Sequence, residues 1–228
     1  MRIISYLAPS LPAALFETIA RRLGAELMFE ERISGPLAGD DEPFSRGDAD
    51  IGFICAPSYR MLRGTMELLP ALVPLDARAG GRPVYFADVV VRRDSRVRSF
   101  DDLRGGRWAY NDRNSRSGWF SMIERAGGAE FFSSLLHAGS HLRSLDAVAG
   151  GRADAAAIDS NVLALHPRDD LRVIESWGPF AIQPAIIRSA IPEERKREVA
   201  ATLLSIRRDE LGTFGFGGFT LVDEAAYL

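Results

Sequence analysis

The order of apolar and polar residues along the chain predicts alternating strands and helices. Short apolar runs at residues 3–7 and 27–29 flank a segment, residues 11–23, in which leucine and isoleucine recur every four residues. Side chains at that spacing share one face of a helix, whereas short apolar runs bounded by turn residues are typical of buried strands. The chain is therefore predicted to open with a strand, a helix and a second strand.

The same alternation continues to the end of the chain and predicts an α/β protein. Further strands are predicted at residues 50–55, 84–92, 108–111, 153–158, 171–175 and 185–188. Helices are predicted to begin at Pro57, Ser99 and Pro192 and to cover residues 118–126 and 142–149, the Pro192 helix ending near Arg208. The glycine-rich residues 212–218 are expected to form a loop or a helix stop, because no strand and helix follow in the order that a dinucleotide fingerprint needs.

Two successive α/β units of similar size predict a protein with two lobes. We expect lobe 1 to comprise residues 1–86 and 185–228, and lobe 2 to comprise residues 87–184. Two hinge-crossing strands, near residues 84–91 and 176–188, are predicted to connect them. In open parallel sheets ligands bind beyond the carboxyl ends of the strands, which makes that edge the expected place for function.

Composition and charge exclude several classes of partner. The 228 residues carry a formal net charge of −3, which gives no global attraction to nucleic acid or to an anionic membrane. No apolar run approaches the ~18 residues that cross a bilayer, so direct membrane insertion is not expected. Cys55 is the only cysteine, so an intramolecular disulfide is impossible. The first residues lack the pattern of a secretory signal, which predicts a cytoplasmic protein as written, or a periplasmic one if a leader has been removed.

The polar turn at residues 111–118 is the strongest local signal for chemistry. It joins a predicted strand to an apolar helix and contains Ser115, Ser117 and Gly118. N–H groups at a helix start lack partners inside the helix, and serine hydroxyls can donate to phosphate-like oxygens. A second interpretation stays open, in which Ser115 or Ser117 is only the N-cap of the helix.

Other combinations of reactive residues carry weaker hypotheses. Cys55, His141 and Asp159 are the residue types of a nucleophilic triad, but they lie far apart in sequence, and a buried strand cysteine is usually apolar filler. His137 and His141 are four residues apart, yet Gly139 interrupts the helix that zinc ligation would need. No metal and no cofactor are therefore expected. Ser117 lacks the flanking glycines of a nucleophile elbow.

Several motifs together resemble the phosphate/phosphite/phosphonate-binding proteins of ABC importers. Their order and spacing match this family, a group with the type II periplasmic-binding-protein fold, most closely between about residues 84 and 160. The matching segments are residues 47–52 (GDADIG), 57–59 (PSY), 89–95 (VVVRRDS), 99–105 (SFDDLRG), 114–118 (NSRSG), 139–141 (GSH) and 154–160 (DAAAIDS).

The resemblance implies a set of ligand contacts. Contacts to the oxyanion come from Ser115, Ser117 and Gly118, and His141 completes the cradle. An aromatic side chain that closes from lobe 1 and another that lines the cleft are implied at Tyr59 and Tyr85, and Ser10 follows the first strand of lobe 1.

Two of the implied positions leave alternatives open. Arg116 stands where the family usually has a small hydroxyl residue, so it either adds a cation for the oxyanion or points to solvent. Asp159 matches an acidic position that faces a ligand's amine, and it is equally suited to cap the next helix.

The predicted function is that of a solute-binding protein that clamps a small oxyanion between two lobes. A phosphate, a phosphonate or a related organic anion is the expected ligand, and an ABC permease is the expected partner. The sequence favours a binding protein over an enzyme. Two alternatives stay open on the same fold, namely a cytoplasmic enzyme of the menaquinone-pathway or pyrimidine-pathway type, and a ligand-sensing domain.

Overall fold

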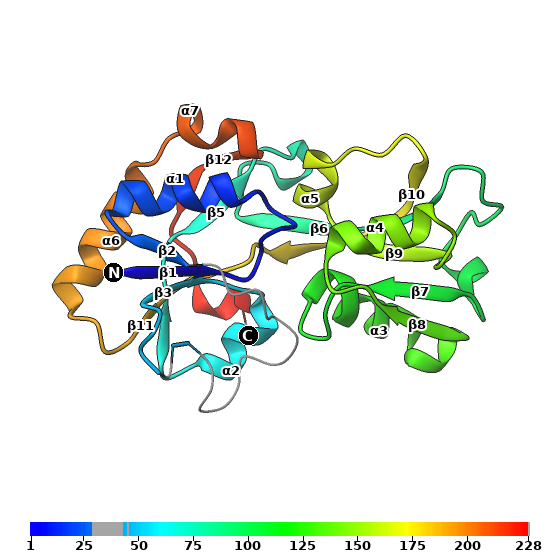
Figure 1. The fold of residues 1–228 in the computed structure, drawn as a ribbon, viewed down its shortest axis with the longest axis horizontal. Coiled ribbons are helices and arrows are strands. Elements are labelled where there is room, and N and C mark those ends of the chain that lie inside the picture. Colours follow the sequence, from blue (N-terminus) through cyan, green and yellow to red (C-terminus); the bar gives the residue numbers. More distant parts are fainter. Residues whose placement is uncertain (29–42, 45, 228) are drawn as a thin grey trace. The chain divides into compact units, whose positions relative to one another are not determined.

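A computed structural model describes residues 1–28, 43, 44 and 46–227, and the chain forms two compact units in it. Unit 1 comprises Met1–Val84 and Ala181–Leu228, and unit 2 comprises Tyr85–Phe180 (Figure 1). The chain thus crosses between the units twice, after Val84 and after Phe180. Each unit contains both helices and strands, as the apolar pattern predicted.

Unit 1 is built on a mixed sheet with the strand order β2-β1-β3-β11-β4. The β1, β2 and β3 strands are parallel, and β11 runs antiparallel to both β3 and β4. The elements of this unit are β1 (Arg2–Ser5), α1 (Ala13–Leu23), β2 (Glu26–Met28), β3 (Ile51–Phe53), α2 (Ala56–Leu62), β4 (Met66–Leu68), β5 (Ala71–Pro74), β11 (Ala185–Arg188), α6 (Glu193–Ser205), α7 (Arg208–Leu211) and β12 (Phe216–Thr220), with short 3₁₀ turns at Ala77–Ala79, Gly212–Phe214 and Glu224–Tyr227.

The buried faces of unit 1 follow from the alternation along its strands. Phe16 of α1 packs against Phe53, with ring centroids 5.2 Å apart, while Ile4 and Ile186 belong to the cluster around α2. Neighbouring residues of a strand point to opposite faces, so apolar residues at successive positions bury both sides of the sheet. Helices α1 and α2 accordingly lie on opposite sides of these strands (Figure 1).

Unit 2 is built on a sheet with the order β10-β6-β9-β7-β8. The β7, β8 and β9 strands are parallel to one another, and β6 runs antiparallel to β9. Its elements are β6 (Val84–Arg92), a 3₁₀ turn (Asp101–Leu103), β7 (Arg107–Tyr110), a π-helical turn (Arg116–Phe120), α3 (Ser121–Ala126), a 3₁₀ turn (Ala129–Phe131), β8 (Ser134–His137), α4 (His141–Ala149), β9 (Ala155–Asp159), α5 (Ser160–Leu165) and β10 (Leu171–Ala181).

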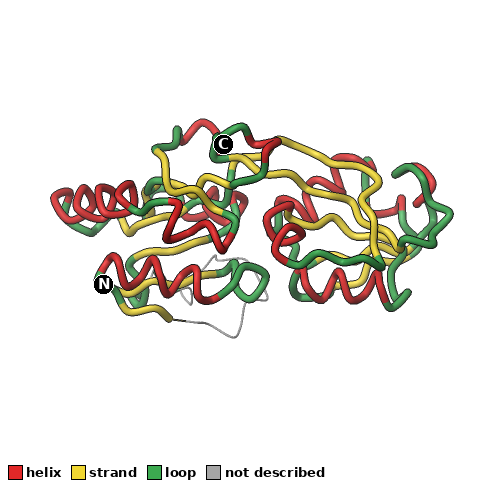
Figure 2. The backbone as a smooth tube through the Cα atoms, turned by 90° about the horizontal axis from the view of Figure 1, so that it is seen from above, coloured by secondary structure: helices red, strands yellow, loops and turns green. Residues whose placement is uncertain are grey.

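An aromatic cluster forms one side of the core of unit 2. Phe100, Trp108, Phe131 and Phe132 are buried together with ring centroids 5.0–6.0 Å apart, the spacing at which edge and offset contacts add to apolar burial. Leu145 and Val148 of α4 are buried as well. Helices lie on both sides of these strands, which fixes the loops at the strand ends (Figure 2).

The structure differs from the predicted elements at several places. Gly212 is the C-cap of α7, as the prediction of a helix stop has it. Residues 216–218 belong to β12, which pairs antiparallel with β5, so the expectation of a loop was wrong for them. The predicted helix at residues 118–126 begins with a π-helical turn, and the segment after Ser99 forms only a 3₁₀ turn. The terminal helix ends at Ser205, and the strand predicted at residues 171–175 continues to Ala181. Phe29, expected in the second strand, lies outside the described residues.

Candidate functional site

Topology gathers the predicted polar residues of unit 2 at one edge of its sheet. The carboxyl ends of the parallel strands β7, β8 and β9 meet at this edge, so the segments at residues 111–118, 138–141 and 159–161 follow them there. Ala87 of the antiparallel β6 lies opposite Asp159, which brings the start of β6 to the same edge. A site assembled here draws on loops that are far apart in sequence.

The turn after β7 is closed by its own serine. Ser115 is the N-cap of the π-helical turn, and its Oγ accepts a hydrogen bond from the backbone N–H of Gly118 at 3.0 Å. The carbonyl of Ser115 accepts from the N–H groups of Trp119 and Phe120, both at 3.1 Å. The capping interpretation of Ser115 therefore describes its backbone contacts, and its hydroxyl still has hydrogen-bonding capacity.

A chain of polar contacts links this turn to α4. Ser115 Oγ lies 3.4 Å from Ser117 Oγ, which in turn lies 3.2 Å from Nε2 of His141. Asn111 Nδ2 lies 3.3 Å from the same imidazole nitrogen. The two serines and the histidine are all buried. We call these four residues, Asn111, Ser115, Ser117 and His141, the serine–histidine cluster.

Gly118 is required by the packing of this cluster. A Cβ atom at Gly118 would lie 1.9 Å from Oδ1 of Asn111, far inside contact distance. The absence of a side chain therefore lets the Asn111 carboxamide lie against the turn and reach His141. The group that approaches Gly118 closely in this structure is the Asn111 carboxamide. A contact between Gly118 and a ligand stays a prediction.

The imidazole of His141 is neutral near physiological pH. Burial lowers the pKa of His141 from 6.5 to about 4, because a charged ring loses its hydration there. The cluster thus consists of neutral hydrogen-bonding groups. Such groups can bind an anion through dipoles, and they can exchange hydrogen-bond partners at lower cost than paired charges.

Arg116 is directed to other partners in unit 2. Its guanidinium makes two contacts with the carboxylate of Glu124, at 2.5 and 2.9 Å, and it lies 4.4 Å above the ring of Phe180. Phe180 also packs against Tyr85, with ring centroids 6.0 Å apart. This pairing is neither of the two alternatives given for Arg116, and contact between Arg116 and an oxyanion stays a prediction.

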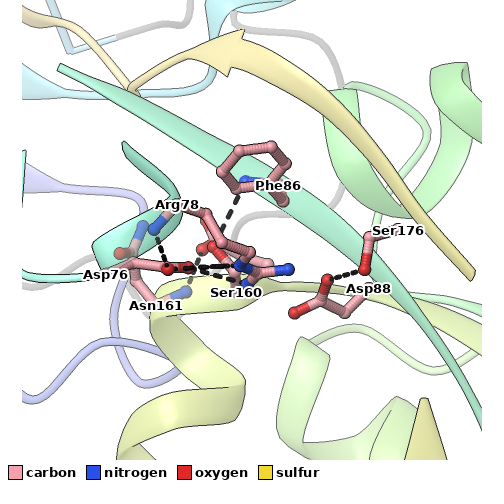
Figure 3. A network of polar contacts seen from close by, with 8 residues as sticks. Asp76, Arg78, Phe86, Asp88, Ser160, Asn161 and Ser176 are labelled. Carbon is pink, nitrogen blue, oxygen red and sulfur yellow. Dashed lines mark hydrogen bonds and ion pairs between the residues drawn. The ribbon is translucent and has the colours of Figure 1, made fainter. Parts of the chain in front are cut away.

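Asp159 is the last residue of β9, and Ser160 and Asn161 follow it at the same edge. The Asp159 carboxylate caps α5 by accepting from the N–H of Asn161 at 2.8 Å, so the capping role exists, and contact with a ligand amine stays a prediction. Ser160 Oγ accepts from the backbone N–H of Phe86 at 3.2 Å, and Ser176 Oγ donates to buried Asp88 at 2.6 Å (Figure 3). These contacts tie the start of β6 to β9 and β10.

The remaining predicted site residues belong to unit 1. Ser10 lies in the turn between β1 and α1. The buried Tyr59 of α2 donates its hydroxyl hydrogen to Oε1 of Glu224 at 2.9 Å and packs edge-on against Tyr227. Burial and the Glu224 carboxylate raise the pKa of Tyr59 to about 12. Cys55 also lies in unit 1, at the start of α2, whereas its hypothetical triad partners belong to unit 2.

Two participants were missed by the sequence analysis. Asn111 stands inside the motif that drew attention, but nothing in its position after a strand distinguishes it from a turn residue. Glu224 lies 165 residues from Tyr59, so no local pattern could pair them. Among the described residues, no three His, Cys, Asp or Glu side chains are grouped to hold a metal ion, and no helix is long and apolar enough to span a membrane.

A family comparison adds an independent observation. The sequence profile of the family described as "ABC transporter, phosphonate, periplasmic substrate-binding protein" matches residues 10–227. The chain belongs to this phosphonate-binding family. It is a solute-binding protein, and the enzyme alternative on the same fold is not supported.

Solved structures agree with the family on the fold. A binding component of an ABC phosphonate transporter from Pseudomonas aeruginosa is 17% identical, with a TM-score of 0.81 over 100% of this chain and 82% of the other. PhnD1 from Prochlorococcus marinus, in complex with methylphosphonate, is 14% identical, with a TM-score of 0.79 over 100% and 94%. A Xanthomonas citri protein bound to ATP is 18% identical, with a TM-score of 0.71 over 99% and 92%. This family member therefore has the two-lobed type II periplasmic-binding-protein fold.

Proposed function

We propose that the serine–histidine cluster of unit 2 binds a small oxyanion and that the protein delivers this ligand to an ABC permease. One observation carries the proposal: Ser115, Ser117 and His141, which the resemblance assigned to the ligand, lie within hydrogen-bonding reach of one another at the ligand-binding edge of the sheet. Membership of a substrate-binding family supports a small ligand and a permease as partners.

The ligand class is a phosphonate, a phosphate or a related organic anion. Hydroxyl groups that can turn their hydrogens to a ligand suit tetrahedral oxyanions, which present several acceptor oxygens at once. The similarity in fold to a protein that holds methylphosphonate supports the same chemistry. The net charge of −3 gives no basis for nucleic-acid binding, and none of the described helices is long and apolar enough to cross a membrane.

We further propose that the two units close when the ligand binds, as expected for a two-lobed binding protein. The two chain crossings, after Val84 and after Phe180, support this because they fall at the start of β6 and near the end of β10, and element-terminal residues can act as hinges. Ser10 and Tyr59 of unit 1 were expected to approach the ligand in that state. Small-angle scattering with and without methylphosphonate would measure the change, and an unchanged radius of gyration on saturation would contradict closure.

Calorimetry with methylphosphonate, phosphite, phosphate and sulfate tests the proposed binding directly. Ser117→Ala should weaken binding by tenfold or more, because it removes a buried hydroxyl from the cluster. Ser133→Ala is the matched control, since Ser133 Oγ donates only to the carbonyl of Gly106 before β8 and should leave affinity unchanged. If none of the four anions binds, or if Ser117→Ala binds as tightly as the unaltered protein, the site assignment is wrong.

A further inference from the structure

The orientation of the Asn111 carboxamide decides how hydrogens can be arranged in the serine–histidine cluster. With Nδ2 facing His141, as in this structure, Nε2 accepts, because Nδ2 has hydrogens and no lone pair. A neutral imidazole with an accepting Nε2 carries its hydrogen on Nδ1. In this arrangement Ser117 also donates to Nε2, over 3.2 Å. The arrangement corresponds to the neutral tautomer of His141 that is protonated on Nδ1.

The hydroxyl of Ser115 donates in the same direction, toward His141. Because the hydrogen of Ser117 is directed to the imidazole, Ser115 donates to Ser117 over 3.4 Å and accepts from the N–H of Gly118. The hydrogens of both serines are thus used inside the cluster. The two hydroxyls can then offer a ligand only their lone pairs, which repel an ionised oxygen.

An unsatisfied atom of Asn111 shows how this arrangement can change. Among the described residues, Oδ1 of Asn111 is buried without a hydrogen-bond donor, although its amide partner Nδ2 is engaged. A half-turn of the carboxamide about its Cβ–Cγ bond exchanges the two atoms. Oδ1 then faces Nε2 of His141 and can accept from it, provided that Nε2 carries a hydrogen.

We propose that the site takes up one proton with each doubly ionised oxyanion, and that this proton resides on Nε2 of His141. The balance is simple: a dianion, a neutral imidazole and one proton form a complex of dianion and imidazolium. A singly protonated oxyanion reaches the same complex by passing its proton to Nε2. The Nε2–H then donates to Asn111 Oδ1, and the hydroxyl hydrogen of Ser117 turns to the ligand. This inference rests on the proposed oxyanion binding and deepens it.

Charge neutralisation in the surroundings supports this proton uptake. Of the two arginines of the turn, Arg116 is already paired with Glu124, and Arg113 lies 4.9 Å over the ring of Trp119. The buried imidazole is neutral, with its pKa near 4, and a dianion at contact distance would favour its charged form. The other titratable groups on α4 and on the segments packed against it are Arg107 paired with Asp154, Tyr110, Asp112, Arg113, His137, Asp146 paired with Arg168, Arg143 and Asp159.

Sulfate is the sharpest probe, because it stays doubly ionised across the useful pH range. Calorimetry at one pH in buffers of different ionisation enthalpy counts the protons taken up on binding. We expect one proton per sulfate, and a dissociation constant that rises about tenfold per pH unit between pH 6 and 8. With methylphosphonate, uptake should be absent below the second pKa of the ligand and should approach one proton above it.

A spectroscopic readout and a variant isolate His141. The ¹⁵N shifts of the imidazole should report a neutral ring protonated on Nδ1 in the empty protein and a doubly protonated ring in the complex. His141→Gln replaces the titrating imidazole with a neutral amide, so any residual sulfate binding should lose its pH dependence. The variant Asn111→Leu should take up fewer protons on binding sulfate than the unaltered protein does, because it lacks the acceptor for Nε2–H. Circular dichroism checks that each variant is folded.

The outcomes separate this inference from the proposed function. Sulfate or methylphosphonate binding without proton uptake, with a neutral imidazole in the complex, would overturn the inference and leave oxyanion binding standing. Failure of the unaltered protein to bind any oxyanion would overturn both. The imidazole shifts of the wild-type protein decide the question even if the variants do not fold.

Discussion

Ser117 in unit 2 and Tyr59 in unit 1 carry two hydroxyl groups that the resemblance assigned to the ligand, and they are held very differently. Ser117 contacts neutral groups, a serine and an uncharged imidazole, over 3.4 and 3.2 Å. Tyr59 donates at 2.9 Å to the carboxylate of Glu224, which Arg63 also contacts. A hydrogen bond to an ionised acceptor is stronger than one between neutral groups.

This difference means that the hydrogen bonds around Ser117 can rearrange, whereas those of Tyr59 hold part of unit 1 in place. Arg60 donates to the carbonyl of Tyr227, and the ring of Tyr227 is buried against Tyr59, so α2 holds the segment at Glu224–Tyr227 in place. Moving the hydroxyl of Tyr59 to a ligand would leave the Glu224 carboxylate with one donor fewer. The hydroxyl of Ser117 can turn to a ligand without taking a hydrogen bond from a charged group. We therefore expect unit 2 to bind the anion and Tyr59 to stabilise unit 1.

The largest expected effect is the change in the free energy of unfolding with pH, which depends on His141 in unit 2. The folded-state pKa of His141 is about 4, below its ordinary value of 6.5. Between these values the unfolded chain binds the proton and the folded cluster does not, so the free energy of unfolding falls as pH drops from about 6.5 to about 4. The full loss is about 3 kcal/mol. Denaturant unfolding at pH 7, 5.5 and 4 measures it.

The control for this pH effect is the same titration of His141→Gln. Carboxylates elsewhere also lose favourable contacts in acid, and the difference between the two proteins removes their common contribution. The stability difference should shrink by about 3 kcal/mol from pH 7 to pH 4. Parallel curves for the two proteins would mean that the imidazole is not held neutral in the folded cluster.

Gly118→Ala should disrupt the cluster directly. The new Cβ would lie 1.9 Å from Asn111 Oδ1, so the carboxamide must move away from His141, at a cost of about 1–3 kcal/mol in stability. Oxyanion binding should fall below detection in calorimetry. Gly212→Ala is the matched control, because its φ of −62° suits alanine and its Cβ would meet only Arg208 Cγ at 3.8 Å. An unaltered affinity in Gly118→Ala would place the ligand elsewhere.

Tyr59→Phe tests the anchor in unit 1. The variant removes one hydrogen bond to a carboxylate, which should lower the free energy of unfolding by about 1.5–3 kcal/mol. Ligand affinity should stay within about threefold. Glu224→Gln keeps the shape of the partner and should show a smaller loss. A tenfold weakening of methylphosphonate binding in Tyr59→Phe, with stability unchanged, would restore Tyr59 to the ligand site.

The elements of the sheets could be predicted from sequence because they depend on local patterns. Residues 84–92 and 185–188 form strands with the predicted bounds, since their β-branched residues and flanking turns are both local signals. The strand β12 was missed because two of its five residues are glycines, which are depleted in strands, and its pairing with β5 comes from tertiary contact. The extension of β10 to Ala181 likewise depends on its neighbour β6 and has no local signal.

The candidate site could be predicted in its residues but not in their partners. The motif at residues 114–118 and His141 were identified, and the structure brings Ser115, Ser117 and His141 together. That Glu124 would take the charge of Arg116 depends on how a π-helical turn continues into α3, which no spacing rule describes. Tyr59 illustrates the same limit, because its partner Glu224 comes from the other end of the chain.

The smallest expected effect concerns Arg116, the member of the turn that departs from the family pattern. Its pair with Glu124 is partly exposed, so Arg116→Gln and Glu124→Gln should each change stability by less than about 1 kcal/mol. Because the guanidinium is already neutralised, Arg116→Gln should change oxyanion affinity by less than about threefold. Calorimetry on both variants at low and high salt measures this.

The two variants together decide which role Arg116 has. If Arg116 only fastens the turn to Glu124 and Phe180, both substitutions loosen the same contacts and should alter affinity in the same direction. If Arg116 reaches the ligand, Glu124→Gln releases its charge and should tighten binding, while Arg116→Gln should weaken it. Opposite signs would therefore move Arg116 into the ligand site, and equal small changes would leave binding to the neutral cluster of Ser117 and His141.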